Sequence, residues 1–407
     1  MTGPLFARNT EIAETQAMPP RRSATDRDSR AAPASGATAT SWTKRLAGLV
    51  AALVLALIAA EGVLRIVAPI PYHEWIVYNA DPAVGYLPEP GQLIVNRHGG
   101  HVQINKHGFR GGEWALDATP ETLRIAVFGG SAAFCFEAAS DQAPWPNVLE
   151  HELTTQLGQP VEVLNFGIPG FTTDRSLRNY KAHGRDFAPD LVLVYHTWND
   201  LKLFRHRDPQ DRTMGPYVPT LPTWQKIVRS LQLGRYARNA VWAADNRRLE
   251  GRFAAAEPDA PTAAVMPIDG AQFEREREDF TAFVHAVQAD GGRVALVSQA
   301  GLASPENVNP QFVSKHLGDL ARMTDFLGMS VDQVVRSWVR VGNIIEEVAR
   351  TEGALFIDGW NAVPHEPEFF NDHVHLSDKG SHRLAKAIAK ELGKESGTGT
   401  YFGQSPK

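Results

Sequence analysis

The order of apolar and polar segments along the chain predicts a sheet with helices packed on both of its faces. From about residue 120, short β-branched runs alternate with longer segments that have helical periodicity. This alternation is typical of βαβ units with parallel strands buried on both faces. The expected strands are Leu123–Phe128, Val161–Asn165, Leu191–Tyr195, Arg293–Ser298 and Ala354–Ile357, and the expected helices include Pro146–Leu157, Phe273–Ala289, Val331–Thr351 and Asp378–Leu392.

One apolar segment near the N-terminus, Leu46 to Ala68, has no polar face and predicts a transmembrane helix. As a helix it would extend about 34 Å, compared with about 30 Å for the hydrocarbon core of a bilayer. Glu61 and Arg65 lie four residues apart near its end, where they can pair. The alternatives are a buried core helix and a cleavable signal peptide. The long preceding tail and the lack of a small-residue cleavage site argue against the signal peptide.

Basic residues flank this segment on its N-terminal side only. Lys44 and Arg45 adjoin it, whereas no lysine or arginine occurs between Arg65 and Arg97. The positive-inside rule then predicts a single-pass protein of the inner (cytoplasmic) membrane, with its N-terminus in the cytoplasm and the rest in the periplasm. Residues 1–45 are rich in Ala, Ser, Thr and Pro and are expected to be a disordered cytoplasmic tail.

The remaining chain divides around the alternating pattern. We expect a lead segment at 72–120, which contains "NKHGFRGGEW", then a catalytic domain at 121–395 and a flexible tail at 396–407. An insertion at 203–270 separates the third and fourth strands. Insertions of this size near the active edge of a sheet often shape access to a site.

Composition narrows the classes of function. The chain has 407 residues with a net charge of −5, and no basic stripe indicates nucleic-acid binding. Its single cysteine, Cys135, excludes intramolecular disulfides and CxxC zinc sites, and we expect a buried structural thiol. No cofactor is expected, and the sequence leaves the oligomeric state open.

Polar residues follow four of the expected strands. The first is followed by Gly129-Gly130-Ser131, the second by "NFGIPGFTT" at 165–173, the third by "HTWND" at 196–200 and the fifth by "NDHVHLSDKG" at 371–380. Because the carboxyl ends of parallel strands meet at one edge, we expect these four stretches to lie close together.

Together they supply the groups that acyl transfer requires. Ser131 can be a nucleophile, although a serine after a strand and two glycines is also a common helix cap. His375 can act as its base, with Asp372 three residues earlier as the orienting carboxylate. The backbone N–H of Gly170 and the carboxamide of Asn199 can donate to an oxyanion, although Gly170 could be a simple turn and Asn199 an Asx-turn residue.

In this order the four stretches resemble the SGNH (GDSL-type) hydrolases over about residues 122–393. Ser131 in "FGGS" matches the nucleophile, Gly170 the oxyanion glycine and Asn199 in "TWND" the oxyanion asparagine. Asp372 and His375 match the D-x-x-H block. The resemblance implies a flavodoxin-like αβα sandwich with a mostly parallel five-stranded sheet, no required metal, and ester or acyl-group chemistry. A membrane anchor ahead of such a domain resembles bacterial envelope members of the family.

Some residues depart from this pattern or allow another interpretation. Gly130 stands where the family has aspartate, Thr197 where it has glycine, and Gly167 is the second choice for the oxyanion glycine. A metal site is an alternative for the residues Asp372, His373, His375 and His365. Asp200 is expected to be structural, and His196 and His382 to be surface or helix residues.

The expected function is that of a membrane-anchored, extracytoplasmic serine esterase acting on an acyl or O-acetyl ester of a lipid or carbohydrate. One alternative is an O-acyltransferase that modifies a cell-envelope polysaccharide, with a sugar hydroxyl in the place of water. The other is a non-catalytic envelope binding protein on the same fold, against which the presence of Ser131, Asp372 and His375 argues.

Overall fold

The computed structural model divides the chain into two units, Met1–Ala60 and Glu61–Lys407. Most of the predicted N-terminal tail, much of the predicted insertion and the end of the predicted C-terminal tail lie outside the described residues, so these expectations remain predictions. The structure describes residues 39–69, 76–205 except 97 and 120, 223–255, 268–308 except 269, and 327–397, together with the single residues 316, 318 and 320.

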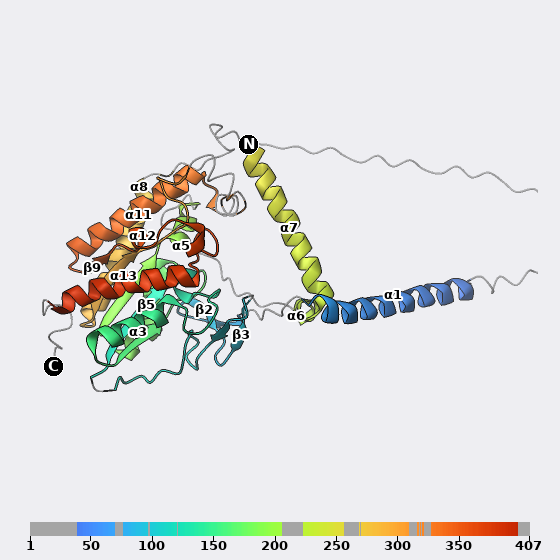
Figure 1. Ribbon diagram of the computed structural model, residues 1–407, viewed down its shortest axis with the longest axis horizontal. Coiled ribbons are helices and arrows are strands. Elements are labelled where there is room, and N and C mark those ends of the chain that lie inside the picture. The colour runs from blue at the N-terminus through green and yellow to red at the C-terminus, as the bar shows by residue number, and fades with distance from the viewer. Residues whose placement is uncertain are drawn as a thin grey trace, which may run out of the picture. The chain divides into compact units, whose positions relative to one another are not determined.

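The second unit is built on a five-stranded sheet in which every neighbouring pair is parallel (Figure 1). Its order is β6-β5-β7-β8-β9, the flavodoxin-like arrangement 2-1-3-4-5. Each expected strand is present with bounds that differ by one residue at most, which confirms the predicted α/β fold. The strands are β5 Leu123–Gly129, β6 Val161–Asn165, β7 Leu191–His196, β8 Arg293–Ser298 and β9 Leu355–Ile357.

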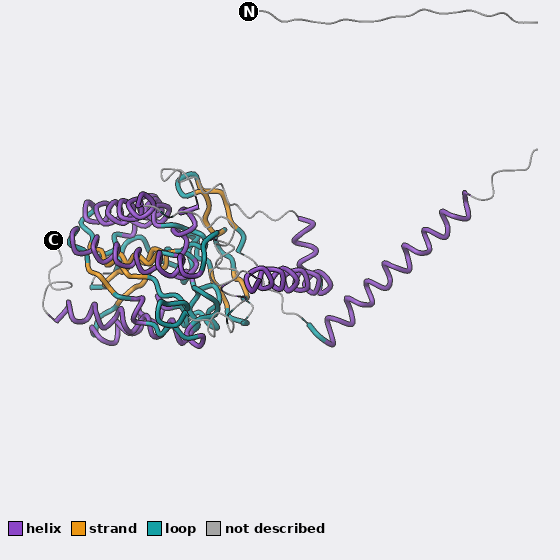
Figure 2. The backbone as a smooth tube through the Cα atoms, turned by 90° about the horizontal axis from the view of Figure 1, so that it is seen from above, coloured by secondary structure: helices purple, strands orange, loops and turns teal. Residues whose placement is uncertain are grey.

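Helices cover both faces of this sheet (Figure 2). Ile125 and Val127 of β5 belong to the cluster formed with α3 and α13, whereas Ala126 and Phe128 belong to the cluster formed with α4, α8 and α11. Because successive side chains of a strand point to opposite faces, the continuous apolar run of β5 supplies both cores. The covering helices are α3 Trp145–Leu157, α13 Asp378–Gly397, α4 Thr173–Asn179, α8 Gly270–Ala289 and α11 Val331–Thr351.

Helix α11 shows how local sequence determines an element boundary. The Ser330 hydroxyl accepts from the backbone N–H of Gln333, and the Gln333 side chain accepts from the backbone N–H of Ser330. This reciprocal capping box satisfies two N–H groups that have no partner within the helix, so α11 starts at Val331.

Shorter elements complete the described part of the chain. They are the strands β1 Tyr78–Asp81, β2 Gly85–Pro88, β3 Leu93–Val95 and β4 His101–Gln103, the helices α2 Ser131–Phe134, α5 Trp198–Leu201, α6 Thr223–Ser230, α7 Gln232–Ala255 and α12 Gly359–Ala362, a π-helical turn at Tyr180–Gly184, and 3₁₀ turns at Arg185–Phe187, Lys202–Arg205 and Pro367–Phe369.

The predicted transmembrane segment is helical. Helix α1 spans Ala39–Val67, and its portion Trp42–Val67 is long and apolar enough to cross a membrane by length and composition. Arg65 Nε donates to Glu61 Oε1 over 2.8 Å, so the expected pair is present.

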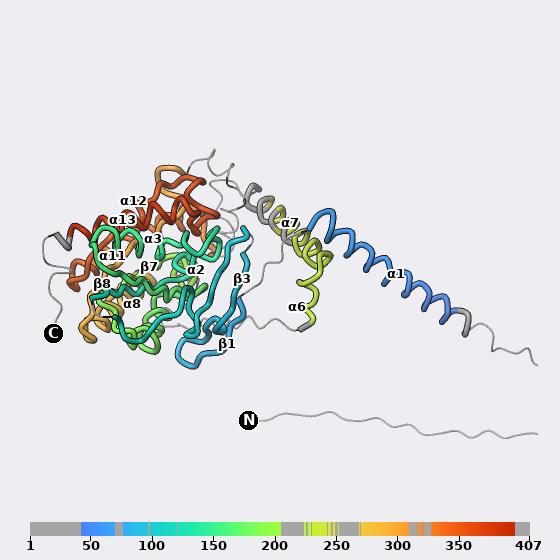
Figure 3. The backbone as a smooth tube through the Cα atoms, turned by 60° about the horizontal axis from the view of Figure 1, so that its bottom comes forward, coloured from blue at the N-terminus to red at the C-terminus, as the bar shows by residue number. Residues whose placement is uncertain are grey.

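The lead segment forms two antiparallel ribbons, β1–β2 and β3–β4, beside the core (Figure 3). The buried Asn96 joins the second ribbon to the loop that follows α2. Its Nδ2 donates to Phe136 O over 2.8 Å and to Ala138 O over 2.6 Å, while its Oδ1 accepts from the N–H groups of His98 and Gly100. A fully satisfied buried amide of this kind fixes the loop, because each lost partner leaves a desolvated polar group.

Asn96→Asp should destabilise the protein strongly, since it turns a carboxylate oxygen toward two carbonyl oxygens. We expect a loss of about 3 kcal/mol or more in the free energy of unfolding, against roughly 1–3 kcal/mol for Asn96→Ala. Chemical denaturation measures both. The control is Asn79→Asp on the exposed surface of β1, which should change the free energy by no more than about 0.5 kcal/mol. Equal midpoints for Asn96→Asp and Asn79→Asp would show that the Asn96 contacts do not form.

Candidate active site

The strand register brings three of the predicted site stretches to one edge of the sheet. Gly129, the last residue of β5, pairs with Tyr195, and Asn165, the last residue of β6, pairs with Val127. The last residues of β5, β6 and β7 therefore lie within about two residues of one another along the strand direction. The stretches that follow these strands lie close together at the same edge of the sheet.

Ser131 begins α2 directly after β5, and its side chain does not cap that helix. The N-cap residue is Gly130, which makes no side-chain cap hydrogen bond. Instead Ser131 Oγ lies 2.7 Å from His375 Nε2. The alternative interpretation of Ser131 as a helix cap is therefore wrong.

Asp372 holds the histidine ring from the other side. Asp372 Oδ2 lies 2.6 Å from His375 Nδ1, and Asp372 Oδ1 accepts the backbone N–H groups of Val374 and His375, both over 2.8 Å. A carboxylate on Nδ1 keeps the proton on that nitrogen, which leaves Nε2 to accept from the Ser131 hydroxyl. The His375 and Asp372 side chains are 28% and 27% exposed, so a solute can reach the site.

His375 and Asp372 each stabilise the charged form of the other. Partial burial disfavours the imidazolium, but the adjacent Asp372 carboxylate outweighs it and raises the pKa of His375 above its ordinary value. Partial burial also disfavours the carboxylate, yet the attraction and hydrogen bond of His375 lower the pKa of Asp372 well below its usual range. Asp372 is thus ionised across the physiological range, ready to stabilise a positive charge on His375.

Asn199, from the third stretch, and Phe171, from the second, both lie beside Gly130, the residue before Ser131. Asn199 Nδ2 donates to Phe171 O over 2.8 Å and lies 2.3 Å from the position that a β-carbon on Gly130 would occupy. Phe171 O lies 3.2 Å from the same point. Any side chain at 130 would displace the Asn199 amide, which gives a steric reason for glycine where the family has aspartate.

The loop that carries Gly170 requires glycine and is held from the lead segment. Gly170 has φ +87°, in the left-handed region, and its missing β-carbon would lie 2.7 Å from Tyr86 Oη. That hydroxyl donates to Pro169 O over 2.8 Å, and the Tyr86 ring packs edge-on against Phe171 at 5.3 Å. Gly167 also tolerates no side chain, because a β-carbon there would lie 2.8 Å from Phe134 N.

The lead segment also holds the end of α2. Buried Arg110, in the "GFRG" stretch, donates through Nη1 to Phe134 O over 2.9 Å and to Cys135 O, and its backbone bridges to Asn165 at the end of β6. Cys135 is half-buried, and burial raises the pKa of its thiol to about 11, which fits the expected structural thiol. Tyr86 and Arg110 lie outside the four family stretches, so sequence reasoning did not place them at the site.

In the third stretch, the prediction for His196 is wrong, Asp200 is structural, and Thr197 does not need to be glycine. His196, expected on the surface or a helix, is buried in β7 with Nε2 2.8 Å from Ser176 Oγ, and burial lowers its pKa to about 3. Asp200 is structural, as expected: it accepts from the backbone N–H and hydroxyl of Thr173, and burial raises its pKa to about 7. Thr197 has φ −176°, extended backbone that needs no glycine.

The residues considered as metal ligands make other contacts. His365 Nδ1 lies 2.6 Å from Gly301 O, and the His373 ring packs on Trp198 at 4.4 Å. Among the residues that the structure describes, no group of three or more His, Cys, Asp or Glu side chains has the geometry to hold a metal ion.

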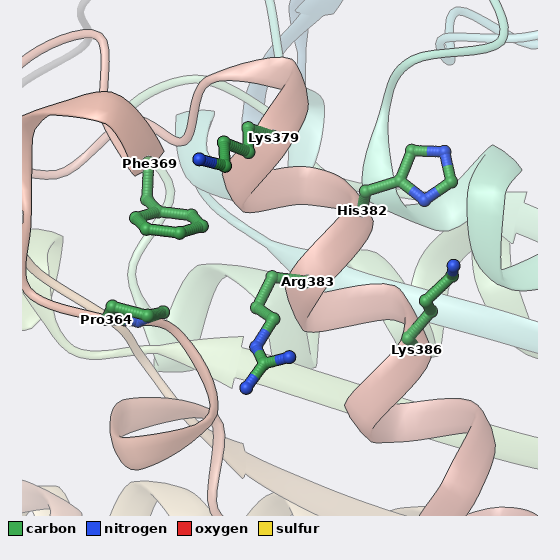
Figure 4. Close-up of a pocket in the computed structure, with 6 residues that line it drawn as sticks. All are labelled: Pro364, Phe369, Lys379, His382, Arg383 and Lys386. Atoms are coloured by element: carbon green, nitrogen blue, oxygen red, sulfur yellow. The ribbon is translucent and has the colours of Figure 1, made fainter.

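A hollow of about 460 Å³ lies elsewhere, along the exposed face of α13 (Figure 4). Pro364 and Phe369 line it together with four residues of that helix, among them the exposed His382. Lys379 is ion-paired with Glu368 and Lys386 with Glu152. None of the predicted site residues lines this hollow.

The fold and the Ser-His-Asp arrangement together define an α/β ester-hydrolysing enzyme. The family model for the GDSL-like lipase/acylhydrolase family matches residues 127–383, well over half of the chain, and the protein belongs to this family. The predicted resemblance is thereby confirmed, and with it the class of enzyme. A search of curated proteins finds no match.

Several solved structures are similar at low identity. An acetylxylan esterase from Geobacillus stearothermophilus matches at 14% identity over 66% of this chain and 93% of its own, with a TM-score of 0.39. A lipase/acylhydrolase from Enterococcus faecalis matches at 16% identity over 67% and 96%, with a TM-score of 0.39. A putative acylhydrolase from Bacteroides fragilis matches at 12% identity over 67% and 87%, with a TM-score of 0.36. The family assignment rests on the family model.

Gly170→Ala should lose stability and ester hydrolysis for two separable reasons. Left-handed backbone costs alanine roughly 1–2 kcal/mol, and the new methyl group collides with Tyr86 Oη. Tyr86→Phe alone removes one hydrogen bond, worth about 0.5–1.5 kcal/mol. The double variant Gly170→Ala/Tyr86→Phe should lose less stability and less activity than the two single variants lose together. The phenylalanine ring has no hydroxyl with which the alanine methyl group could collide.

Gly158→Ala at the end of α3 is the matched control. It has φ +65° but no atom within 4 Å of the added carbon, so it should cost stability only and show no coupling to Tyr86→Phe. Unfolding and kcat are measured for the three single variants and the two double variants. Strict additivity of Gly170→Ala and Tyr86→Phe would contradict the Tyr86–Gly170 contact.

Proposed function

We propose that the protein is a membrane-anchored serine esterase in which Ser131 is the nucleophile, His375 the general base and Asp372 its orienting carboxylate. The observation that carries the proposal is the continuous hydrogen-bonded line from Ser131 Oγ through His375 to Asp372. A nucleophile within reach of a base that is itself oriented by a third group is the arrangement that acyl transfer requires.

In the first half of the reaction, His375 Nε2 accepts the Ser131 proton as Oγ attacks the ester carbonyl carbon. The imidazolium that forms is stabilised by the ionised Asp372. When the tetrahedral intermediate collapses, the imidazolium donates its proton to the departing alcohol oxygen, and the acyl group remains on Ser131.

Water completes the cycle. His375 accepts a proton from the water as it attacks the acyl carbonyl carbon, and then returns that proton to Ser131 Oγ as the carboxylic acid leaves. In both halves, negative charge develops on the former carbonyl oxygen. The backbone N–H groups of Ser131 and Gly170 and the Asn199 carboxamide donate to it. The packing of Asn199 against Gly130, next to the nucleophile, supports this role.

The proposed substrate is an acyl or O-acetyl ester of a lipid or carbohydrate outside the cytoplasm. Helix α1 anchors the chain in the inner membrane. Lys44 and Arg45 at its N-terminal end, with no Lys or Arg between Arg65 and Arg97, support a cytoplasmic N-terminus and a periplasmic catalytic domain. An ester-bearing envelope component is a substrate that a domain at that surface can reach.

Ester hydrolysis by the full-length protein in detergent, over a panel from acetyl to long-chain esters, tests the proposal. Wild type should hydrolyse at least one ester class, and Ser131→Ala should lose roughly three to six orders of magnitude in kcat while keeping its melting temperature. Hydrolysis by Ser131→Ala at the wild-type rate would overturn the proposed nucleophile.

The acid limb of kcat/KM should lie above the ordinary histidine pKa of about 6.5. The protonated His375 cannot accept the Ser131 proton, and Asp372 raises the pKa at which that proton is lost. Asp372→Asn should move the limb to lower pH and reduce kcat by about 10⁴. Glu137→Gln, which removes a carboxylate with a smaller influence on His375, should move the limb less. A limb unchanged in Asp372→Asn would contradict the assignment of His375 as the titrating base.

Asn199→Ala should lower kcat and kcat/KM alike by about 10²–10³, with KM nearly unchanged, because its donor is used in the transition state. Asn179→Ala is the matched control: its side chain is also buried and also donates to a backbone carbonyl, Phe166 O. It should lower stability and leave kcat near normal. An equal loss of kcat in the two variants would reduce the role of Asn199 to packing.

A further inference from the structure

Helix α6 and the residue that follows it carry an exposed apolar stripe. Trp224, Ile227, Val228 and Leu231 are 63%, 58%, 43% and 37% exposed. Their spacing of i, i+3, i+4 and i+7 places them on one face of a helix. In an aqueous setting this face would leave a tryptophan and three aliphatic side chains in water, which is unfavourable for each of them.

The hairpin formed by α6 and α7 is basic in a chain that is acidic overall. Residues 223–255 contain seven Lys and Arg against two Asp and Glu, whereas the whole chain has a net charge of −5. A helix with an apolar stripe in a basic segment is the pattern of a helix that lies in the plane of an anionic bilayer surface.

The hairpin is tied to the C-terminal end of α1. The Glu61 carboxylate accepts the backbone N–H groups of Gln232 over 2.8 Å and Leu233 over 3.0 Å, and so satisfies groups that the start of α7 leaves without helical partners. A second contact lies directly after α1, seven residues beyond Glu61: Ala68 O accepts from the Tyr236 hydroxyl over 2.8 Å.

The corner between the two helices is tight. A β-carbon on Gly234 would lie 1.8 Å from Val228 O, so the first turn of α7 packs directly on the last turn of α6. The stripe on α6 therefore has a fixed relation to the Glu61 contact, and through it to the end of the apolar helix.

Because the hairpin is bound to Glu61, the position of Glu61 along α1 determines how deep the hairpin lies in the membrane. Glu61 lies six residues before Val67, where the membrane-spanning candidate ends. That separation is about 9 Å of helix. It matches the roughly 5–10 Å to which an interfacial helix buries its apolar face.

We propose that α6 lies in the headgroup–acyl boundary of an anionic phospholipid bilayer, with Trp224, Ile227, Val228 and Leu231 inserted, at the membrane surface where α1 ends. This inference rests on the proposed anchoring of α1. It assigns α6, within the 203–270 insertion, to membrane contact.

Nitroxide quenching in nanodiscs tests the proposal on the full-length chain. The discs contain phosphatidylglycerol and phosphatidylcholine, with the nitroxide either near the headgroup or near the end of the acyl chain. Cys135→Ala provides a background without cysteine, and retained ester hydrolysis reports that each variant is folded. An environment-sensitive fluorophore is attached at Ile227→Cys on the stripe, at Ser230→Cys beside it, or at Leu53→Cys in α1.

The Ile227 probe should lose most of its fluorescence to the shallow nitroxide, the Ser230 probe much less, and the Leu53 probe should be quenched by the deep one. Quenching at Leu53 with equal, weak quenching at Ile227 and Ser230 would overturn the inference while leaving the anchor intact. No quenching at Leu53 would overturn the anchor, and the inference with it.

Discussion

The hydrogen bond between His375 Nε2 and Ser131 Oγ connects residues 244 positions apart, and the rest of the catalytic domain determines whether it can form. Ser131 is placed by the end of β5, the second strand of the sheet from its edge. His375 is placed by a loop that Asp372 closes through two backbone N–H groups, just before α13 begins. Helix α13 packs in the same cluster as α3 and β5, so the core that buries apolar surface also sets the distance between His375 Nε2 and Ser131 Oγ.

The lead segment adds a second layer of support from outside the family domain. Arg110 and Asn96 bind carbonyls at and after the end of α2, and Tyr86 binds the carbonyl before Gly170. These contacts fix both the helix that starts with Ser131 and the loop that would donate to the oxyanion. The geometry of the site therefore depends on residues between α1 and β5. Stabilisation of an oxyanion depends in general on donors that do not have to reorganise.

The sheet could be predicted almost to the residue, because each strand is an apolar run bounded by turn residues and buried on both faces. The D-x-x-H block and the serine after β5 were also visible, since strand ends of a parallel sheet converge. The contacts of Tyr86 and Arg110 could not be foreseen, because they depend on tertiary packing of ribbons with no periodic signal. His196 was misjudged for a related reason: a histidine at a strand end looks exposed until the elements around it bury the ring against Ser176.

The most direct test of the central claim is peptide mapping of the full-length protein after reaction with a fluorophosphonate. The account predicts a single adduct on Ser131, none on Ser131→Ala, and a slow reaction in His375→Ala, because the histidine must remove the hydroxyl proton. An adduct on another serine, or labelling of Ser131→Ala at the wild-type rate, would contradict it.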